Sequence, residues 1–156
     1  MALTAKFRNN GQVCISPNRF YIHEKKKDEF ADLMVKKTKK LKIGNGMDDG
    51  VQLGPLATAK RLSEVEELVD ITKKEGAKVL LGGKRPSGFN KGYFYEPTVF
   101  DEVKDNYTIM KQEPFGPLVP MLSFKTFDEV IERANNNDLG LCSCLLYTSD
   151  AADESS

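Results

Sequence analysis

The feature that most constrains the fold is an alternation along the chain between short β-rich runs and longer amphipathic segments. The runs expected to form strands or extended chain are residues 19–23, 77–81, 93–100 and 118–124. The segments with apolar residues at helical spacing are residues 26–41, 58–76 and 126–140. Strands that alternate with helices of this length predict a layered α/β domain with a largely parallel sheet.

The element boundaries carry further predictions. Thr58 and Thr126 are expected to cap the second and third helices with their hydroxyl groups. The second helix is expected to bury one stripe, made of Leu62, Val65, Leu68, Val69 and Thr72. Because Pro97 has no N–H group to donate to a neighbouring strand, it predicts that residues 93–100 lie at an edge of the sheet.

Length and charge limit the classes of function. A chain of 156 residues with 40% hydrophobic content can bury one ordinary core, so we expect one domain or part of one. Because 23 basic side chains balance 23 acidic ones, no long-range field favours nucleic acid or an anionic membrane. No apolar run approaches the ~18 residues that span a bilayer, and residues 1–6 lack the apolar stretch of a signal peptide. We therefore expect a cytoplasmic protein whose partner is a small molecule or another subunit.

The cysteines and the histidine exclude several kinds of site. Cys14, Cys142 and Cys144 give neither a disulfide framework nor the spacing of metal ligands, so no metal site is expected. His23, the one histidine, closes a β-rich run and is expected at the surface end of a strand. No motif makes it the base of a catalytic triad, which argues against a cysteine protease or a serine hydrolase.

Cys14 itself admits two interpretations. A glycine and a small polar residue lead into it, which would let the backbone turn closely around the thiol and leave the Cys14 N–H free to face a bound carbonyl oxygen. That arrangement is a nucleophile with an oxyanion donor. A free cysteine is more commonly buried as a small hydrophobe, and spacing alone leaves both interpretations open.

Around Cys14, the sequence resembles the active-site cysteine motif of the aldehyde dehydrogenase superfamily. The matching residues are Phe7, Gly11, Gln12 and Cys14, with Arg19 five residues after the thiol. Further matches follow in the family's order: Gly54-Pro55-Leu56, Gly82-Gly83, residues 92–98 and residues 113–117. The resemblance covers residues 6 to about 143 and implies a three-layer α/β/α catalytic domain of aldehyde dehydrogenase type, truncated at both ends, at residues 1–143.

The resemblance also implies a mechanism and a cofactor. Cys14 would attack the carbonyl carbon of a small aldehyde, and a thioester would remain after hydride transfer to NAD or NADP. Glu113 would hydrogen-bond the nicotinamide ribose, and Phe115 would lie beside the nicotinamide. Without the resemblance, residues 113–117 would be interpreted as a rigid proline-containing turn with one buried aromatic side chain.

Several parts of the family's machinery have no counterpart in these 156 residues. They are the general-base glutamate, the glycine-rich nucleotide loop, the oxyanion-hole asparagine and the C-terminal part that completes the substrate tunnel. We therefore expect this chain to be inactive alone and to belong to a longer enzyme that is a homo-oligomer, a dimer or a tetramer.

Arg8 carries the prediction about substrate. The segment Lys6-Phe7-Arg8-Asn9 resembles the succinate semialdehyde dehydrogenase branch, in which this arginine grips the distal carboxylate of the substrate. A guanidinium binds a carboxylate through two parallel hydrogen bonds and would leave its charge unpaired beside a neutral aldehyde. The alternative is an arginine that makes a structural salt bridge.

Ser16 departs from the family pattern. The succinate semialdehyde dehydrogenase branch often has a second cysteine two residues after the first, so Ser16 predicts that no local disulfide switch forms here.

Residues 144–156 resemble the translation of a sequencing adapter and are expected to be non-native. The alternative is a strand at 141–147 with an acidic tail. Two other functions stay open: a cofactor-independent thiol hydrolase and a non-catalytic assembly fragment.

Overall fold

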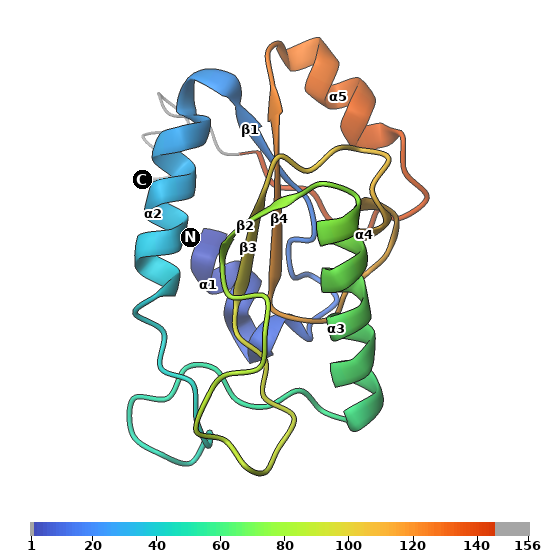
Figure 1. The fold of residues 1–156 in the computed structure, drawn as a ribbon. Helices are drawn as coiled ribbons and strands as arrows, with labels where there is room; N and C mark the ends of the chain where they lie inside the picture. Colours follow the sequence, from blue (N-terminus) through green and yellow to red (C-terminus); the bar gives the residue numbers. More distant parts are fainter. Residues whose placement is uncertain (1, 146–156) are drawn as a thin grey trace.

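A four-stranded sheet forms the middle layer of the computed structural model, which describes residues 2–145 (Figure 1). The strands are β1 (Phe20–His23), β2 (Lys78–Leu81), β3 (Thr98–Asp101) and β4 (Leu118–Phe124), in the order β1-β4-β3-β2. β4 is parallel to both β1 and β3, whereas β2 is antiparallel to β3. The predicted, largely parallel sheet is confirmed, with one antiparallel strand at its edge.

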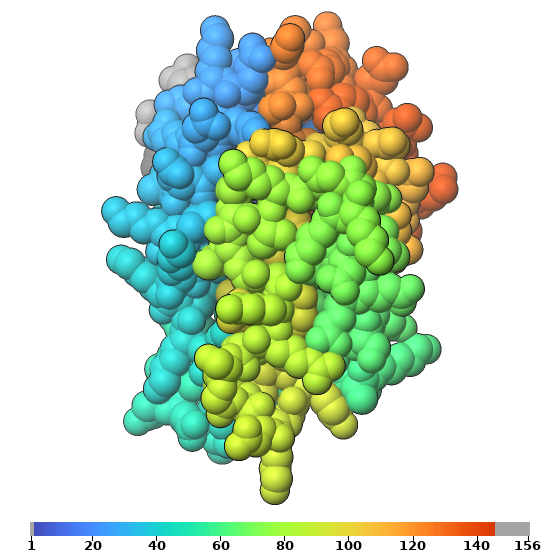
Figure 2. Space-filling view, in the orientation of Figure 1, coloured from blue at the N-terminus to red at the C-terminus, as the bar shows by residue number. Residues whose placement is uncertain are grey.

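Helices cover both faces of this sheet (Figure 1). The helices are α1 (Ala2–Phe7), α2 (Lys27–Thr38), α3 (Ala59–Lys74), α4 (Thr108–Lys111) and α5 (Phe127–Asn135). α1 and α2 pack on one face, and α3 and α4 pack on the other. In the space-filling view, α2 lies at the left and α3 at the right of the molecule, and the turn-rich residues 82–92 extend at its lower end (Figure 2). The predicted three-layer α/β/α arrangement is therefore confirmed.

Alternation along β4 explains why the sheet needs a layer on each face. Leu118 and Leu122 belong to the core beside α3, while Val119 and Met121 belong to the core beside α2. Successive side chains of a strand point to opposite faces, and these four side chains are at most 1% exposed. A strand buried on both faces has to be apolar throughout, which is what made β4 recognisable in the sequence.

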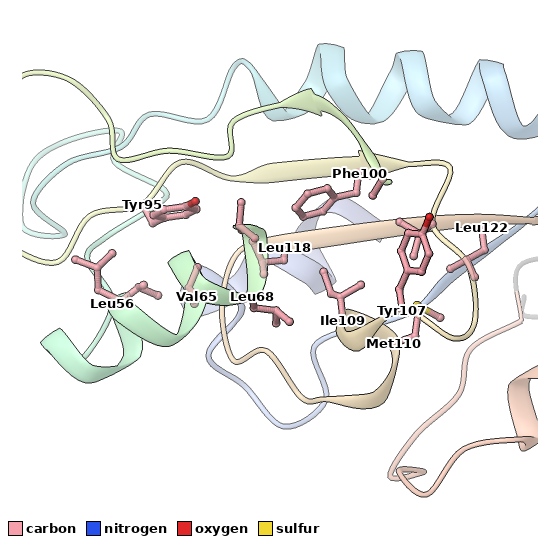
Figure 3. Close-up of a cluster of buried hydrophobic side chains, with 14 residues drawn as sticks. Leu56, Val65, Leu68, Tyr95, Phe100, Tyr107, Ile109, Met110, Leu118 and Leu122 are labelled. Carbon is pink, nitrogen blue, oxygen red and sulfur yellow. The ribbon is translucent and has the colours of Figure 1, made fainter. Parts of the chain in front are cut away.

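The core beside α3 follows the predicted helical stripe. Its α3 members are Leu62, Val65, Leu68, Val69 and Thr72, all of which are buried. Figure 3 shows Val65 and Leu68 pointing from α3 toward Phe100 of β3 and Leu118 of β4. Burying one such side chain stabilises the fold by roughly 1.5–3 kcal/mol. The hydroxyl of Thr58 accepts a hydrogen bond of 3.1 Å from a backbone N–H in the first turn of α3, so the predicted cap is also confirmed.

The predicted edge position of residues 93–100 is wrong. β3 lies between β4 and β2, and its residues are buried. Pro97 comes just before the first residue of β3, so its missing N–H interrupts no ladder, and Thr98 donates to the Pro117 carbonyl at 2.8 Å. A second proline, Pro120, lies inside the central strand β4, and pairing with β1 begins only at Met121. Prolines therefore occur here where their missing donors disturb the sheet least.

The outer helices bury less of their apolar surface than predicted. Thr126 caps α5 as expected, and Val130 is buried, yet Phe127 is 50% and Ile131 45% exposed. On α2, Leu33 is 47% exposed. α5 lies at the end of the sheet where β4 finishes (Figure 1), and within residues 2–145 nothing covers its outer side.

Two short helices, α1 and α4, were not predicted. They have six and four residues, too few to show a periodic pattern. Residues 141–145 lie in no strand, and the remainder of the predicted strand at 141–147, like the predicted non-native tail from residue 146 on, lies outside the described residues. No helix within residues 2–145 has the length and apolar character needed to cross a membrane.

Candidate active site

Residues 8–19, which we call the thiol loop, leave α1 through an unusual backbone. Asn9, Asn10 and Gly11 have φ values of 47°, 59° and 76°, so three consecutive residues lie in the left-handed region. The chain then turns again, because Ser16 N–H donates to the Val13 carbonyl at 2.9 Å. These two reversals leave Cys14 exposed. The interpretation of Cys14 as a buried small hydrophobe is therefore wrong.

The side chains that follow Cys14 hold the thiol loop to α1. The Ser16 hydroxyl is buried and donates to the Lys6 carbonyl at 3.1 Å. The Lys6 amine, which is fully buried, donates to Asn18 Oδ1 at 3.2 Å. Burial lowers the pKa of the Lys6 amine to about 7, because a charged ammonium is poorly solvated there. Lys6 thus anchors both ends of the Ser16–Asn18 segment, a role that no sequence pattern indicated.

Residues 113–117, which we call the glutamate turn, lie directly against the thiol loop. A Cβ atom added at Gly11 would collide with the carbonyl oxygen of Gly116. Gly11 therefore has two reasons to be glycine: its positive φ and this close approach of two backbones. The contact brings together the two segments in which Cys14 and Glu113 were identified as site residues.

The glutamate turn presents its side chains in a strained conformation. Phe115 has a φ of 42°, which is rare for a residue with a bulky side chain. The Arg61 guanidinium of α3 lies 5.7 Å from the centre of the Phe115 ring, within the range of a cation–π contact. Glu113 is exposed, and its carboxylate makes no hydrogen bond or ion pair within residues 2–145. The glutamate turn thus offers one exposed carboxylate and one half-buried aromatic ring two residues apart.

Two amides connect the thiol loop to the glycine-proline segment at residues 54–57. Asn10 Nδ2 donates to the Gly54 carbonyl at 2.9 Å, and Gln12 Oε1 accepts from Ala57 N–H at 2.8 Å. Asn10 Oδ1, by contrast, is buried and has no hydrogen-bond partner within residues 2–145. The Leu56 N–H donates to the carbonyl of Tyr93, so residues 92–98 also join this cluster. Segments that are far apart in the sequence thus converge on the thiol loop.

Arg8 lies at the rim of an open hollow of about 580 Å³ beside the thiol loop. Val13 and Ile15, the neighbours of Cys14 on either side, line the same hollow. Arg8 is exposed, and within residues 2–145 its guanidinium makes no ion pair and no hydrogen bond. The alternative of a structural salt bridge therefore finds no partner in this part of the chain. The hollow offers a cation and apolar walls close to the thiol.

His23 and the other titratable groups supply no second site. His23 closes β1 as predicted, where its Nδ1 accepts from Lys25 N–H at 3.2 Å and its ring packs edge-on against Phe124. No cluster of three or more metal-ligating side chains occurs in residues 2–145. In the described chain, Cys14 Sγ makes no hydrogen bond with a histidine or a carboxylate. The described residues thus present a thiol without its own base.

Comparison with known proteins identifies the family. The model of the aldehyde dehydrogenase family matches residues 1–154. The chain is 41% identical over 142 residues to the glutarate-semialdehyde dehydrogenase of Pseudomonas putida, covering 91% of this chain and 29% of that protein. The chain spans about 30% of the length of the curated relatives it matches.

Solved structures agree in fold. The succinate-semialdehyde dehydrogenase of Burkholderia pseudomallei superposes with a TM-score of 0.84 at 39% identity, over 88% of this chain and 28% of that one. An aldehyde dehydrogenase from Bacillus cereus in complex with NAD+ gives a TM-score of 0.83 at 42% identity, over 87% of this chain and 27% of that one. The chain therefore belongs to the aldehyde dehydrogenase family, as the segments around Cys14 and Glu113 had indicated.

Proposed function

We propose that this chain is the thiol-bearing part of an enzyme that oxidises a carboxylate-bearing semialdehyde, such as succinate semialdehyde, to the acid with NAD or NADP. The observation that carries the proposal is the contact between Gly11 and Gly116, which sets an exposed Cys14 beside the turn that bears Glu113 and Phe115. A nucleophile and a dinucleotide-binding turn held together in this way suit a reaction that needs both at one carbon atom.

The first step is addition of the Cys14 thiolate to the aldehyde. The C–S bond forms while the π electrons of the C=O bond move onto oxygen, which becomes an oxyanion. The Cys14 N–H makes no hydrogen bond within residues 2–145 and lies on the turn beside the thiol, so it can donate to that oxygen. Because no described base contacts Cys14 Sγ, the group that removes its proton lies elsewhere in the full-length enzyme.

The second step oxidises the carbon and releases the acid. A bound nicotinamide supplies the hydride acceptor for the aldehydic C–H bond, and the carbonyl re-forms as a thioester on Cys14. Glu113 would accept hydrogen bonds from the ribose hydroxyls of the bound cofactor, and Phe115 would pack beside its nicotinamide, which would orient the hydride acceptor. Water then adds to the thioester carbon, the C–S bond breaks, and the acid leaves with the thiol restored.

Arg8 accounts for the class of substrate. Its guanidinium has no partner within residues 2–145 and borders the hollow that Val13 and Ile15 line. An aldehyde whose reactive end lies at Cys14 can place a distal carboxylate on this guanidinium through a bidentate pair. The relatives named for glutarate and succinate semialdehydes support the same class.

The remaining properties of the enzyme are part of the same proposal. We expect a homo-oligomer, a dimer or a tetramer, which light scattering on the full-length protein would measure. We place the enzyme in the cytoplasm, since Cys14 and Cys142 are free and exposed. The isolated chain is expected to be inactive, because the described residues provide no base for the thiol. A cofactor-independent thiol hydrolase has less support for the same reason.

The test is a substrate comparison in the full-length enzyme, with the flanking genomic sequence restored on both sides of this chain. Nicotinamide reduction would be followed with succinate semialdehyde and with butanal, a neutral aldehyde of the same length. We expect kcat/KM to be at least about 10-fold higher for the semialdehyde, and no activity in C14S. Equal values for the two aldehydes would refute the role of Arg8, and full activity in C14S would refute the role of the thiol.

A further inference from the structure

The guanidinium of Arg19 joins three segments that are far apart in the sequence. Its Nε donates to the Met110 carbonyl at 2.8 Å, and one Nη donates to Asn137 Oδ1 at 2.9 Å. Arg19 is the last residue of the thiol loop, five positions after Cys14. Met110 belongs to α4, which ends at Lys111, just before the glutamate turn. One side chain therefore connects the exit of the thiol loop to the entrance of the glutamate turn.

Among the described residues, Arg19 makes hydrogen bonds and no ion pair. Within residues 2–145, no carboxylate lies within ion-pair distance of its guanidinium. Partial burial lowers its pKa, because desolvation disfavours the charged form. A partly buried charge without a counter-ion is costly unless its donors are used. Here they are used on a backbone carbonyl and an amide, both of which are contacts that fix position.

Arg19 and Gly11 together hold the two segments at both ends. Gly11, near the start of the thiol loop, contacts Gly116, and Arg19, at its end, binds Met110. The thiol loop and the segment from residue 110 to 116 thus lie side by side with opposite chain directions. Cys14 lies between the two fastening points on one segment, and Glu113 lies between them on the other.

We propose that Arg19 is a positioning residue for the oxidation, which fixes the distance between the thiol and the bound nicotinamide. The inference rests on the proposed function, because it needs a substrate carbon bonded to Cys14 and a dinucleotide held at Glu113. In this proposal Arg19 acts through its hydrogen bond to Met110 rather than on the reacting atoms. Since a displacement of about 1 Å in such a site can cost about 100-fold in rate, loss of this contact should slow hydride transfer.

The test compares R19M and R19K in the full-length enzyme. Three quantities are measured: kcat, the isotope effect of deuterium at the aldehydic position, and the rate at which iodoacetamide alkylates Cys14 without cofactor. In R19M we expect kcat to fall about 10- to 100-fold, since the relative placement of thiol and nicotinamide changes. The isotope effect should rise, while the alkylation rate should stay within about twofold because thiol exposure is kept. R19K keeps a donor but lacks the planar fork that reaches both acceptors in fixed geometry, so it should fall between R19M and the unsubstituted enzyme.

The matched control is N137A, which removes the second acceptor and keeps the bond to Met110. Its kcat should stay within about threefold, because the bond to Met110, which joins the thiol loop to the glutamate turn, is kept and one neutral hydrogen bond contributes only about 1 kcal/mol. An unchanged kcat in R19M would overturn the proposal, as would a parallel fall of kcat and alkylation, which indicates general loss of the thiol loop. If R19M does not fold, R19K alone decides: an unchanged kcat and isotope effect overturn the proposal. An unsubstituted enzyme that oxidises no aldehyde refutes the proposed function instead.

Discussion

The α3 face of the sheet and the thiol loop are built on opposite principles. On the α3 face, Leu68, Val69 and Phe100 are nearly or fully buried in regular secondary structure. In the thiol loop, Asn9 and Asn10 adopt left-handed conformations, and Asn10 Oδ1 is buried without a partner in the described chain. One region maximises burial, whereas the other tolerates unfavourable local geometry.

The comparison indicates that the α3 face contributes to stability alone, whereas the thiol loop does not. Left-handed residues and unpaired buried polar atoms each cost roughly 1–3 kcal/mol, and they persist where the surroundings enforce them. Asn9 and Asn10 are such residues beside an exposed cysteine, and the regular core supplies the rigid support; Glu102, with a φ of 58°, and Thr38, whose buried hydroxyl also lacks a partner in the described chain, lie elsewhere. Substitutions in the two regions should therefore have separable effects, on stability in the core and on catalysis in the thiol loop.

The largest effect is expected from G11A. The added methyl group would collide with the Gly116 carbonyl and strain a backbone with a φ of 76°. Because the thiol loop and the glutamate turn would move apart, kcat/KM of the full-length enzyme should fall by at least about 100-fold. G46A is the matched control, since nothing lies near Gly46 and its φ is not positive, and it should keep activity. Activity of G11A within threefold of the unsubstituted enzyme would contradict the contact's importance.

L68A should have the next largest effect, on stability. Truncating this buried side chain leaves a cavity beside β3 and β4 and should lower the free energy of unfolding by about 3 kcal/mol, measured by urea denaturation of the full-length enzyme. At urea concentrations below its unfolding midpoint, L68A should keep the kcat/KM of the unsubstituted enzyme. L33A, at a site that is 47% exposed, should change stability by less than about 1 kcal/mol. A large loss of activity in folded L68A would show that the two regions are not separable.

R8M should change specificity rather than stability. Removing the guanidinium removes a bidentate pair with the substrate carboxylate, so kcat/KM for succinate semialdehyde should fall about 30-fold. The value for butanal should stay within about threefold, because no carboxylate is present to lose a partner. Parallel losses for both aldehydes would mean that Arg8 supports the loop rather than the substrate.

K6M should alter the pH dependence of stability by the smallest amount. The pKa of Lys6 is about 7 in the folded chain, below its ordinary value of 10.5. Between these values the unfolded chain binds more protons, so Lys6 makes the free energy of unfolding rise with pH in this interval. Relative to K6M, the unsubstituted protein should gain roughly 1–2 kcal/mol between pH 7 and pH 8.5, measured from melting temperatures. If the difference in free energy of unfolding between the unsubstituted protein and K6M did not change with pH, this would contradict a buried Lys6 amine with a lowered pKa.

The sequence predicted the elements that local patterns determine. The stripe on α3 and the caps at Thr58 and Thr126 were correct, because helical spacing and capping chemistry act within a few residues. Pro97 misled the assignment of an edge strand, because its effect depends on which residue begins β3. The exposure of Phe127 likewise could not be read locally, since it depends on what packs against α5.

The candidate site was predictable only where the resemblance to a family supplied it. Spacing left Cys14 undecided between a nucleophile and a packed side chain, and the structure decided its exposure. Lys6 was not predicted as a site residue, and Arg19 was named only as part of the motif, because the partners of both are non-local. A lysine in a short helix gives no sign of full burial, and Met110 is 91 positions from Arg19. The roles of Cys14 and Glu113 remain predictions that activity measurements have to test.

The most direct measurement is to trap the acyl intermediate. The full-length enzyme would be mixed with succinate semialdehyde and NAD or NADP, quenched in acid within one turnover, digested and analysed by mass spectrometry. We predict a succinyl group on the peptide that contains Cys14, formed only when the nicotinamide cofactor is present. An acyl group on another residue, or one that forms on Cys14 without cofactor, would contradict the proposed oxidation.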